Sequence, residues 1–444
     1  MTPTELLPAP PHAAARRALL AGSAGNLVEW YEFGVYGCFA TVIAANFFTP
    51  HAGAPGGGSG ALVATYASFA LAFFFRPVGA LLFGRIGDRF GRRPALVLVI
   101  GLMTLATTLI GLLPTRADIG AAAPWLLTFL RVLQGLSAGG EFGGAVSLMA
   151  EYAPPGRRGL YGAWQSFTVA LGLLAGAGTA AALAVVLPAE ALYGWGWRIP
   201  FLLALPLGTV ALWLRTALEE PPGAPPAGPP GATESSEAVE RSGPTALGEQ
   251  ARAVVLGIAR IMGWSAAGYT FLVVLPSHLQ SALGASFRDA LLATTLVNLG
   301  FAASILPAGL LSDRVGRRPV MLGGALGIAV LAHPLMQLLQ SPGASPQTRA
   351  AAVVTAGALV GLLAGPGPAM LAEMFPRRVR CTGLGLSYAL ANAVFSGCAG
   401  LFITALTART ADTAVPAHYA AGACALSAAA LLTLRGNDHR EPLR

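Results

Sequence analysis

Charged residues are scarce in this 444-residue sequence: Asp, Glu, Lys and Arg make up 11% of it, against about 25% in an ordinary soluble protein. Hydrophobic residues make up 55%, and the mean hydropathy is +0.63. So few charges could not cover the surface of a soluble fold of this size, whereas a lipid-facing surface needs none. The composition argues against soluble enzymes, nucleic-acid-binding modules and disordered scaffolds, and it predicts a protein that crosses the bilayer many times.

Lysine is absent, and cysteine is rare. All 28 basic residues are arginine, so the net charge of +8 fits a lysine-poor composition better than a nucleic-acid-binding function. The four cysteines lie in or beside apolar stretches without C-x-x-C spacing, which argues against a disulfide scaffold or a zinc site. We expect no metal ion, no cofactor other than the proton as coupling ion, no nucleic-acid partner and a monomer.

Motifs of familiar enzyme chemistry are also missing. The chain has no H-E-x-x-H, no P-loop, no Ser–His–Asp spacing and no haem motif, so neither catalysis nor ATP-driven transport is predicted. A cleavable signal peptide is not predicted either, because the first apolar run is about 30 residues long and contains two glutamates.

Twelve stretches are long and apolar enough to span a membrane, which takes about 20 residues. They predict an all-α membrane protein with twelve transmembrane helices, since tilted β-strands are shorter and alternate in polarity. The expected spans are Leu19–Phe48, Ala61–Phe83, Ala95–Leu113, Trp125–Met149, Gly162–Leu187, Ile199–Leu218, Ala253–Leu275, Ala290–Leu311, Val320–Leu339, Ala350–Leu371, Gly383–Leu406 and Ala414–Leu434.

The arginines orient these spans. Three lie within spans, Arg198 lies at a span edge, four fall on one side of the membrane and the remaining twenty fall on the other. Such an excess marks the cytoplasmic side, so both termini are predicted to be cytoplasmic, in the inner membrane of a bacterium. The Pro/Gly-rich segment 219–250 is the expected cytoplasmic linker between bundles at 19–218 and 251–434, with cytoplasmic tails at 1–18 and 435–444.

An internal repeat relates the two bundles. The loop G-R-I-G-D-R-F-G-R-R-P, which begins at Gly84, is matched by G-L-L-S-D-R-V-G-R-R-P, which begins at Gly309. The sequence A-E-Y-A-P at Ala150 is matched by A-E-M-F-P at Ala372. The two matches are separated by nearly the same stretch of chain. They therefore predict a duplicated unit, and hence two pseudo-symmetric six-helix bundles, an architecture typical of transporters.

These loops and the R-x-x-Q-G motif at Arg131 resemble those of the major facilitator superfamily. Five further segments resemble its metabolite:proton symporters, which include proline/betaine, α-ketoglutarate, shikimate and citrate transporters. The segments are G-N-L-V-E-W-Y-E-F-G at Gly25, R-P-V-G at Arg76, G-L-S-A-G-G-E at Gly135, W-G-W-R-I-P-F at Trp195 and E-M-F-P at Glu373. The resemblance covers nearly the whole chain, and it implies the major facilitator fold and transport by alternating access.

Charged residues of the repeated loops and the ends of neighbouring spans are the expected gate. By resemblance they form an ionic latch that closes the cytoplasmic side. The alternative is a simple anchor for membrane orientation, but an anchor needs no aspartate in the same place twice. The expected gate residues are Asp88, Arg89, Arg92, Arg93, Glu151, Arg158, Asp313, Arg314, Arg317, Arg318, Glu373 and Arg380.

Acidic residues within spans are costly to insert, at about 2.5–3.5 kcal/mol each near a helix centre, and are therefore candidates for function. Glu29, Glu32 and Glu141 could bind and release the coupling proton, or each could pair with an arginine to hold helices together. The sequence leaves both roles open. In the family that the chain resembles, the position of Glu32 is more often aspartate.

A substrate site is expected between the bundles. Arg131 is its predicted anchor, because a planar guanidinium can donate two hydrogen bonds to a carboxylate. Its alternative role is to pair with Glu29 or Glu32, and Arg76 is expected to snorkel. Other polar residues within spans could contact the substrate, although each more often forms a helix–helix hydrogen bond. They are Gln134, Tyr36, Gln165, Tyr269, Asn298 and Asn392.

Together these features predict a proton-coupled symporter for a small polar metabolite, either a zwitterion such as proline or betaine or a mono- or dicarboxylate. The alternatives are a proton-coupled efflux antiporter and a membrane osmosensor or receptor without transport. Span five reads G-L-L-A-G-A-G from Gly172, without the proline of the G-x-x-x-G-P motif typical of the antiporters. Symport is therefore favoured.

Overall fold

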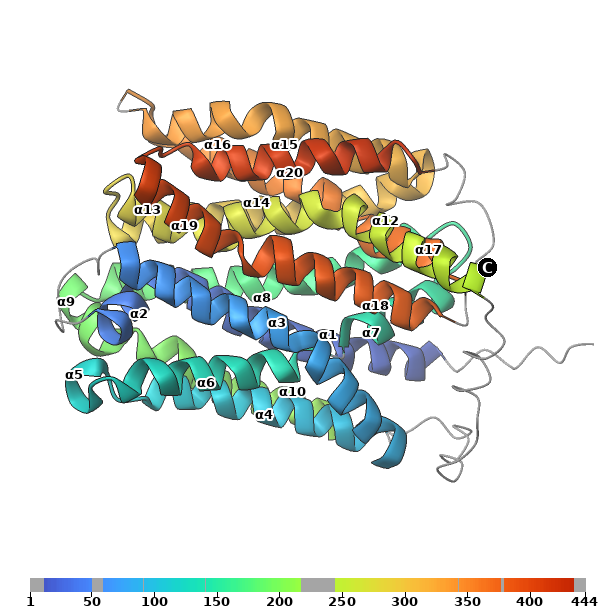
Figure 1. Ribbon diagram of the computed structural model, residues 1–444, viewed down its shortest axis with the longest axis horizontal. Coiled ribbons are helices and arrows are strands. Elements are labelled where there is room, and N and C mark those ends of the chain that lie inside the picture. Colours follow the sequence, from blue (N-terminus) through green and yellow to red (C-terminus); the bar gives the residue numbers. More distant parts are fainter. Residues whose placement is uncertain are drawn as a thin grey trace, which may run out of the picture.

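The protein was analysed as a computed structural model, which describes residues 12–49, 59–90, 92–139, 141–216, 244–341, 343–376 and 379–434. Nearly all of these residues are helical. The helices form two bundles, one from each half of the chain (Figure 1). The predicted linker and tails lie outside the described residues, except for positions 12–18 and 244–250, which are helical.

The N-terminal bundle holds helices that lie within the first predicted domain or extend it by a few residues. They are α1 (His12–Cys38), α2 (Ala40–Ile43), η1 (Ala44–Phe48), α3 (Ser59–Phe90), α4 (Arg92–Leu112), α5 (Arg116–Ile119), α6 (Ala122–Ser137), α7 (Glu141–Tyr152), α8 (Arg158–Val186), α9 (Ala189–Ala191), η2 (Leu192–Gly196) and α10 (Arg198–Thr216).

The C-terminal bundle repeats this order. Its helices are α12 (Pro244–Tyr269), η3 (Thr270–Val274), α13 (Leu275–Ser281), α14 (Phe287–Val315), α15 (Arg317–Gln340), α16 (Pro346–Ala364), α17 (Gly367–Met374), α18 (Arg380–Ala391), η4 (Asn392–Gly397), α19 (Ala399–Thr410) and α20 (Val415–Leu431).

The helices account for the twelve predicted spans. Seven continuous stretches of the described residues are long and apolar enough to cross a membrane, and the pair Ala189–Gly196 and Arg198–Leu214, bent by 48°, makes an eighth. Helices α4 and α20 supply two shorter apolar spans. The first predicted span is divided among α1, α2 and η1, and the fourth between α6 and α7. The all-α fold with twelve membrane-spanning segments is confirmed.

Local breaks within the spans follow the repeat. The π-helical turns η1 and η3 begin at Ala44 and Thr270, and so lie at matching places in the first span of each bundle. Pro276 follows η3 and has no N–H to offer the carbonyl of Leu272. The side chain of Asn298 donates to that carbonyl instead (Nδ2–O 3.3 Å). The carbonyl that the proline leaves without a helical donor is therefore satisfied by a neighbouring helix.

Glycines bring the second and fourth spans of each bundle into contact. A Cβ atom on Gly135 of α6 would overlap the carbonyl oxygen of Ala72 in α3. In the C-terminal bundle, a Cβ on Gly357 of α16 would overlap the carbonyl oxygen of Val297 in α14. These two positions correspond to Gly135 and Ala72 in the register of the repeated motifs. The duplication visible in the loops thus extends to backbone packing within the membrane.

Alanine at position 135 is expected to lower stability by about 1–3 kcal/mol, because the overlap is with backbone and no side-chain rotation relieves it. The measurement is the melting temperature of the detergent-purified protein. Gly178→Ala on α8 is the matched control, since a Cβ there has no neighbour within 4 Å. Equal melting temperatures for the two variants would contradict the close approach of α3 and α6.

The boundary between the bundles runs along a few helix pairs. Helix α8 packs against α14 and α17, α7 packs against α18, and α3 packs against η4 and α19. Figure 1 shows α8 of the N-terminal bundle and α14 of the C-terminal bundle next to each other where the two bundles meet. Polar groups carried by these helices are therefore placed where a transport pathway would lie.

Candidate functional site

Among the described residues, four charged side chains are buried in the membrane-spanning part of the N-terminal bundle. Glu29 and Glu32 lie on α1, Arg76 lies on α3, and Arg131 lies on α6. Their exposed fractions are 6%, 1%, 4% and 0%, respectively. Buried charges at this depth are expensive and are kept where they pair or serve a function.

Arg76 forms an ion pair with Glu29. Its Nη2 lies 3.0 Å from the Glu29 Oε1, and its guanidinium lies over the rings of Phe73 and Phe33, at 4.3 and 4.7 Å from the centroids. The expectation that Arg76 snorkels is therefore wrong. A buried carboxylate and aromatic ring faces compensate its charge inside the bundle, so it does not need to reach a surface.

Arg131 is only partly satisfied. Its Nη1 donates to the Gln134 Oε1 at 2.6 Å, while its Nε and Nη2 are buried without a hydrogen-bond partner among the described residues. The guanidinium lies 4.1 Å from the centroid of Tyr36 and 4.8 Å from that of Phe69. The N–H groups on Nε and Nη2 of the planar guanidinium thus remain available to donate to a carboxylate, as the predicted anchor role requires.

Glu32 accepts no hydrogen bond from the described residues, and both of its carboxylate oxygens are buried. It lies beside Arg131 in the bundle, because the Arg131 guanidinium packs over the rings of Phe33, the next residue, and Tyr36, one helical turn on. A buried carboxylate without hydrogen bonds costs several kcal/mol unless it carries a proton. This acid therefore has the environment of a proton-binding group, whereas Glu29 has that of a paired one.

A small cavity adjoins the Glu29–Arg76 pair. It lies at the boundary of the bundles, where Phe142 of α7 and Tyr388 of α18 stack with ring centroids 3.4 Å apart. Its volume of ≈ 30 Å³ is enough for one or two water molecules and far too small for a metabolite. The two bundles are closed over the charged residues in this structure.

Three of the remaining predicted substrate residues lie at the charged centre, and the other three do not. Tyr36, Gln134 and Tyr269 border the charged centre, and the hydroxyl of Tyr269 is buried without a partner in the described part of the chain. Gln165 instead joins α8 to α1 by donating to Asn26 (Nε2–Oδ1 3.1 Å).

Two predicted amides stabilise the helix breaks. Asn298 donates to the Leu272 carbonyl beside η3. Asn392 starts η4, donates to the Tyr388 carbonyl at 2.9 Å and accepts from Ser396 at 2.7 Å. In this closed arrangement both have structural contacts, which is the alternative that the sequence left open.

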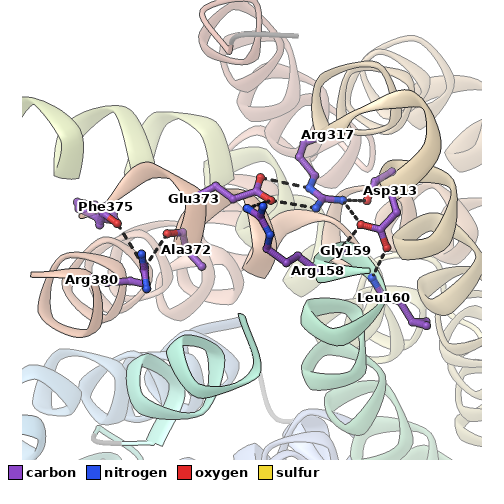
Figure 2. A network of polar contacts seen from close by, with 10 residues as sticks. Arg158, Gly159, Leu160, Asp313, Arg317, Ala372, Glu373, Phe375 and Arg380 are labelled. Atoms are coloured by element: carbon purple, nitrogen blue, oxygen red, sulfur yellow. Dashed lines mark hydrogen bonds and ion pairs between the residues drawn. The ribbon is translucent and has the colours of Figure 1, made fainter. Parts of the chain in front are cut away.

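At one end of the bundles an ionic network joins the two halves (Figure 2). Asp313 of α14 accepts hydrogen bonds from the backbone N–H groups of Gly159 (2.7 Å) and Leu160 (2.9 Å), which open α8 of the other bundle. The N-terminus of a helix carries unpaired N–H groups and a partial positive charge. Asp313 therefore caps a helix that belongs to the opposite half of the molecule.

Arg317 connects this cap to Glu373. Its Nη1 lies 2.8 Å from the Asp313 Oδ1, and its Nη2 lies 3.0 Å from the Glu373 Oε1. Arg158, from the N-terminal bundle, approaches the same Glu373 oxygen at 3.4 Å. All four side chains are largely buried, so the pairs are not weakened by solvent as surface pairs are.

A second contact crosses the boundary nearby. The Nη1 of Arg380 lies 2.9 Å from the Glu151 Oε1 on α7, and its Nε donates to the carbonyls of Ala372 and Phe375 (Figure 2). We call Glu151, Arg158, Asp313, Arg317, Glu373 and Arg380 the latch. The latch thus holds six of the twelve predicted gate residues: five make polar contacts with the opposite bundle, and Arg317 joins Asp313 to Glu373 within its own bundle.

The other predicted gate residues are not part of the latch in the described part of the structure. Arg89 and Arg314 are exposed and Arg318 is half-exposed. The side chains of Asp88, Arg92, Arg93 and of the predicted proton-coupling residue Glu141 lie outside the described residues.

The end opposite the latch is closed by neutral contacts. The hydroxyl of Tyr66 lies 2.7 Å from that of Ser277, and Thr41 donates to the Gln280 Oε1 at 2.9 Å. Each pair joins the N-terminal bundle to α13. Among the described residues, contacts between the bundles therefore lie at both ends, as ion pairs at one end and as uncharged hydrogen bonds at the other.

Ser166 was not predicted as a functional residue, although the structure gives it a contact across the boundary. Its hydroxyl donates to the carbonyl of Ala364 at 2.7 Å. That carbonyl has no helical partner, because residue 368, four positions later, is proline. The signal that could have found this contact was the P-G-P break in span ten, which frees a carbonyl at the centre of a span.

Replacing Ser166 by alanine is expected to lower the stability of the closed protein by about 1 kcal/mol, because the buried Ala364 carbonyl loses this donor. Thermal unfolding in detergent measures this loss. Thr209→Ala is the matched control, since Thr209 of α10 is exposed and its hydroxyl donates within its own helix; its melting temperature should be unchanged. A Ser166→Ala protein as stable as this control would show that the contact contributes nothing.

Known proteins resemble this chain in sequence and in fold. Residues 18–223 match the family described as sugar (and other) transporter, and residues 253–444 match the major facilitator superfamily. The chain is 33% identical over 414 residues to a proline/betaine transporter of Salmonella typhimurium, in a match that covers 91% of this chain and 80% of that protein. The chain belongs to the major facilitator superfamily.

Other relatives of this superfamily member differ in their substrates. The chain is 35% identical to an α-ketoglutarate permease of Escherichia coli, over 86% of this chain and 85% of that protein. The crystal structure of a D-xylose-proton symporter superimposes with a TM-score of 0.73 at 21% identity, covering 93% of this chain and 97% of the other. The predicted resemblance to metabolite:proton symporters is confirmed, and the protein is a multi-pass membrane transporter rather than an enzyme.

Proposed function

We propose that this transporter takes up a small carboxylate-bearing solute together with a proton. The observation that carries the proposal is the pairing of two unsatisfied groups: the Glu32 carboxylate without a hydrogen bond and the Arg131 guanidinium with two unused donors, both among the described residues. The first suits a proton and the second suits a carboxylate. Both are contributed by the N-terminal bundle, and Phe69, which lies against Arg131, meets Tyr269 of the C-terminal bundle.

Proximity of the two groups supplies the coupling. When Glu32 is ionised, it compensates the charge of Arg131 and competes with a substrate carboxylate. When Glu32 binds a proton, Arg131 is left as an uncompensated cation and attracts the carboxylate more strongly. Proton and substrate therefore favour each other's binding, and by linkage the effect is reciprocal. Such positive coupling suits symport; exchange in opposite directions would need competition.

Alternating access is proposed to use the two closed ends in turn. We assign the latch end to the cytoplasm, because the repeated arginine-rich loops lie there and such loops stay on the cytoplasmic side. With a protonated and loaded centre, the latch opens; with an empty and deprotonated one, the neutral contacts of Tyr66 and Thr41 open. The barrier to each step then depends on occupancy of the centre.

Uptake by purified protein in proteoliposomes tests this proposal. A pH gradient, acidic outside, is imposed in the presence of labelled zwitterions and carboxylates, and internal solute and internal pH are followed together. We expect solute to accumulate, protons to enter with it, and both to stop when a protonophore collapses the gradient. Solute driven outward by the same gradient would support an antiporter, and transport indifferent to pH would overturn proton coupling.

A further inference from the structure

The charges at the centre are distributed unequally between the bundles. In the register of the repeated motifs, Glu29, Glu32, Arg76 and Arg131 correspond to Val254, Gly257, Phe301 and Val353, respectively. The repeat that preserves the latch motifs and the glycine crossings has therefore kept no charge at these positions of the C-terminal bundle. Arg76 and Arg131, the two described cations of the centre, therefore both belong to the N-terminal bundle, while the buried Arg260 of the C-terminal bundle donates to Thr433 beyond the end of α20.

Of these two cations, one is already engaged. Arg76 is held by Glu29 at 3.0 Å, with both side chains more than nine-tenths buried, beside a cavity that admits only one or two water molecules. Arg131 has a single hydrogen bond within the described residues, to Gln134, and two open donors. A transported anion therefore meets one open guanidinium.

Aromatic side chains surround the Arg131 guanidinium. Phe69 lies under Arg131 and also meets Tyr269 of the C-terminal bundle, with centroids 6.2 Å apart. Tyr269 contacts Phe73 and Trp30 as well, at 5.4 and 6.1 Å. The faces of such rings bind apolar groups and onium groups but offer no cation to a second carboxylate. The Tyr269 hydroxyl, which is buried without a partner among the described residues, adds an uncharged donor that cannot neutralise an anion.

We infer that the substrate carries a single carboxylate, which Arg131 holds, on a compact body that lies against Trp30, Phe69, Phe73 and Tyr269. Among the described residues of the centre, Arg76 and Arg131, with Glu29 ionised and Glu32 protonated, sum to a charge of +1, which one carboxylate neutralises. A dicarboxylate would leave a desolvated anionic group without a partner. The inference rests on the proposed function and narrows it, excluding di- and tricarboxylates.

Two matched pairs of probes test the inference by competition against a bound reporter solute on the full-length protein. Glutarate and its monoamide, glutaramate, have the same shape and differ by one carboxylate. We expect glutaramate to bind at least tenfold more tightly. Glycine betaine and 3,3-dimethylbutanoate differ only in that the first has an onium nitrogen where the second has a carbon. Both should bind more tightly than glutarate. The ratio of their affinities shows whether the aromatic rings prefer an onium group or an apolar group.

Glu29→Gln provides a gain of function that a structural role would not produce. It removes the charge that engages Arg76 and so supplies a second open cation; the affinity for glutarate should rise at least tenfold, while that for glutaramate changes little. Glu190→Gln, an exposed acid on α9, is the matched control. The probe comparison on the wild-type chain remains decisive if Glu29→Gln does not fold.

Three results would overturn the inference: glutarate binding as tightly as glutaramate, no binding of any of the four probes, or a Glu29→Gln protein with unchanged preference. These failures differ from a failure of symport. Proton-linked uptake of glutarate would leave the proposed function standing and the inference wrong. Preferential binding of glutaramate without any accompanying proton movement would leave the inference standing and the proposed symport wrong.

Discussion

Arg131→Gln should lower substrate affinity and uptake by at least about a hundredfold. Two charge-assisted hydrogen bonds from a buried guanidinium to a carboxylate are worth about 3 kcal/mol or more together, and a factor of one hundred corresponds to about 2.8 kcal/mol. Glutamine keeps a polar side chain next to Gln134 but offers neither the fork nor the charge. Solute counterflow in proteoliposomes measures the loss without requiring a proton gradient.

Arg349→Gln, at an exposed position at the start of α16, is the control for Arg131 and should transport normally. Melting temperatures of both variants show whether the mutated proteins remain folded. If Arg131→Gln bound substrate within threefold of the wild-type protein, the carboxylate would have to be held elsewhere, and the substrate site described here would be wrong.

Asp313→Asn should open the latch. The aspartate caps α8 of the other bundle and pairs with Arg317, with only 7% of its side chain exposed. Removing one partner of a buried ion pair costs about 3–5 kcal/mol. Here the change destabilises only the state in which the latch is formed. The population therefore shifts by about a hundredfold or more towards the state that is open at this end. Accumulation should fail while the protein still inserts and folds.

The shift is measured with a cysteine at Ala369, which is 2% exposed and packs against Gly162 across the boundary. In a background without the four native cysteines, labelling by a membrane-impermeant maleimide should become at least tenfold faster in Asp313→Asn. Asp289→Asn is the control, since Asp289 lies at the other end of the same helix α14 and is exposed. Equal labelling of both variants would show that the latch does not hold the bundles together.

The architecture could be predicted well because its signals are local. Apolar length specifies a span, arginine content specifies a side, and the duplicated G-x-x-x-D-R-x-G-R-R-P loops specify two related bundles. Half of the predicted gate residues also lie in the latch. Their positions at helix ends restrict them to one layer of the molecule, so few partners were available to each.

Partner choice at the centre could not be predicted in the same way. Glu29 and Glu32 are three residues apart, and the same two roles were open to each of them. Only the packing of α3 against α1 shows that Arg76 pairs with Glu29, and only the resulting burial shows that Glu32 accepts no hydrogen bond from the described residues. Such choices depend on helix rotation, which apolar periodicity does not determine to within one side chain.

The contact between Ser166 and Ala364 illustrates a second limit. Pro368 predicts that one carbonyl is freed, but its donor comes from 198 residues away in the chain. No local rule names that donor. The same holds for the neutral contacts opposite the latch, whose hydroxyl and amide groups have no distinctive spacing.

Glu32→Gln shows whether a proton on this buried carboxylate couples the flux of solute to the flux of protons. Solute exchange and proton-driven accumulation are measured on the same proteoliposomes. We expect exchange within a fewfold of the wild-type rate, because glutamine resembles the protonated acid, together with loss of accumulation above the external concentration. If Glu32→Gln still accumulates solute in response to an imposed pH gradient, Glu32 does not carry the coupling proton.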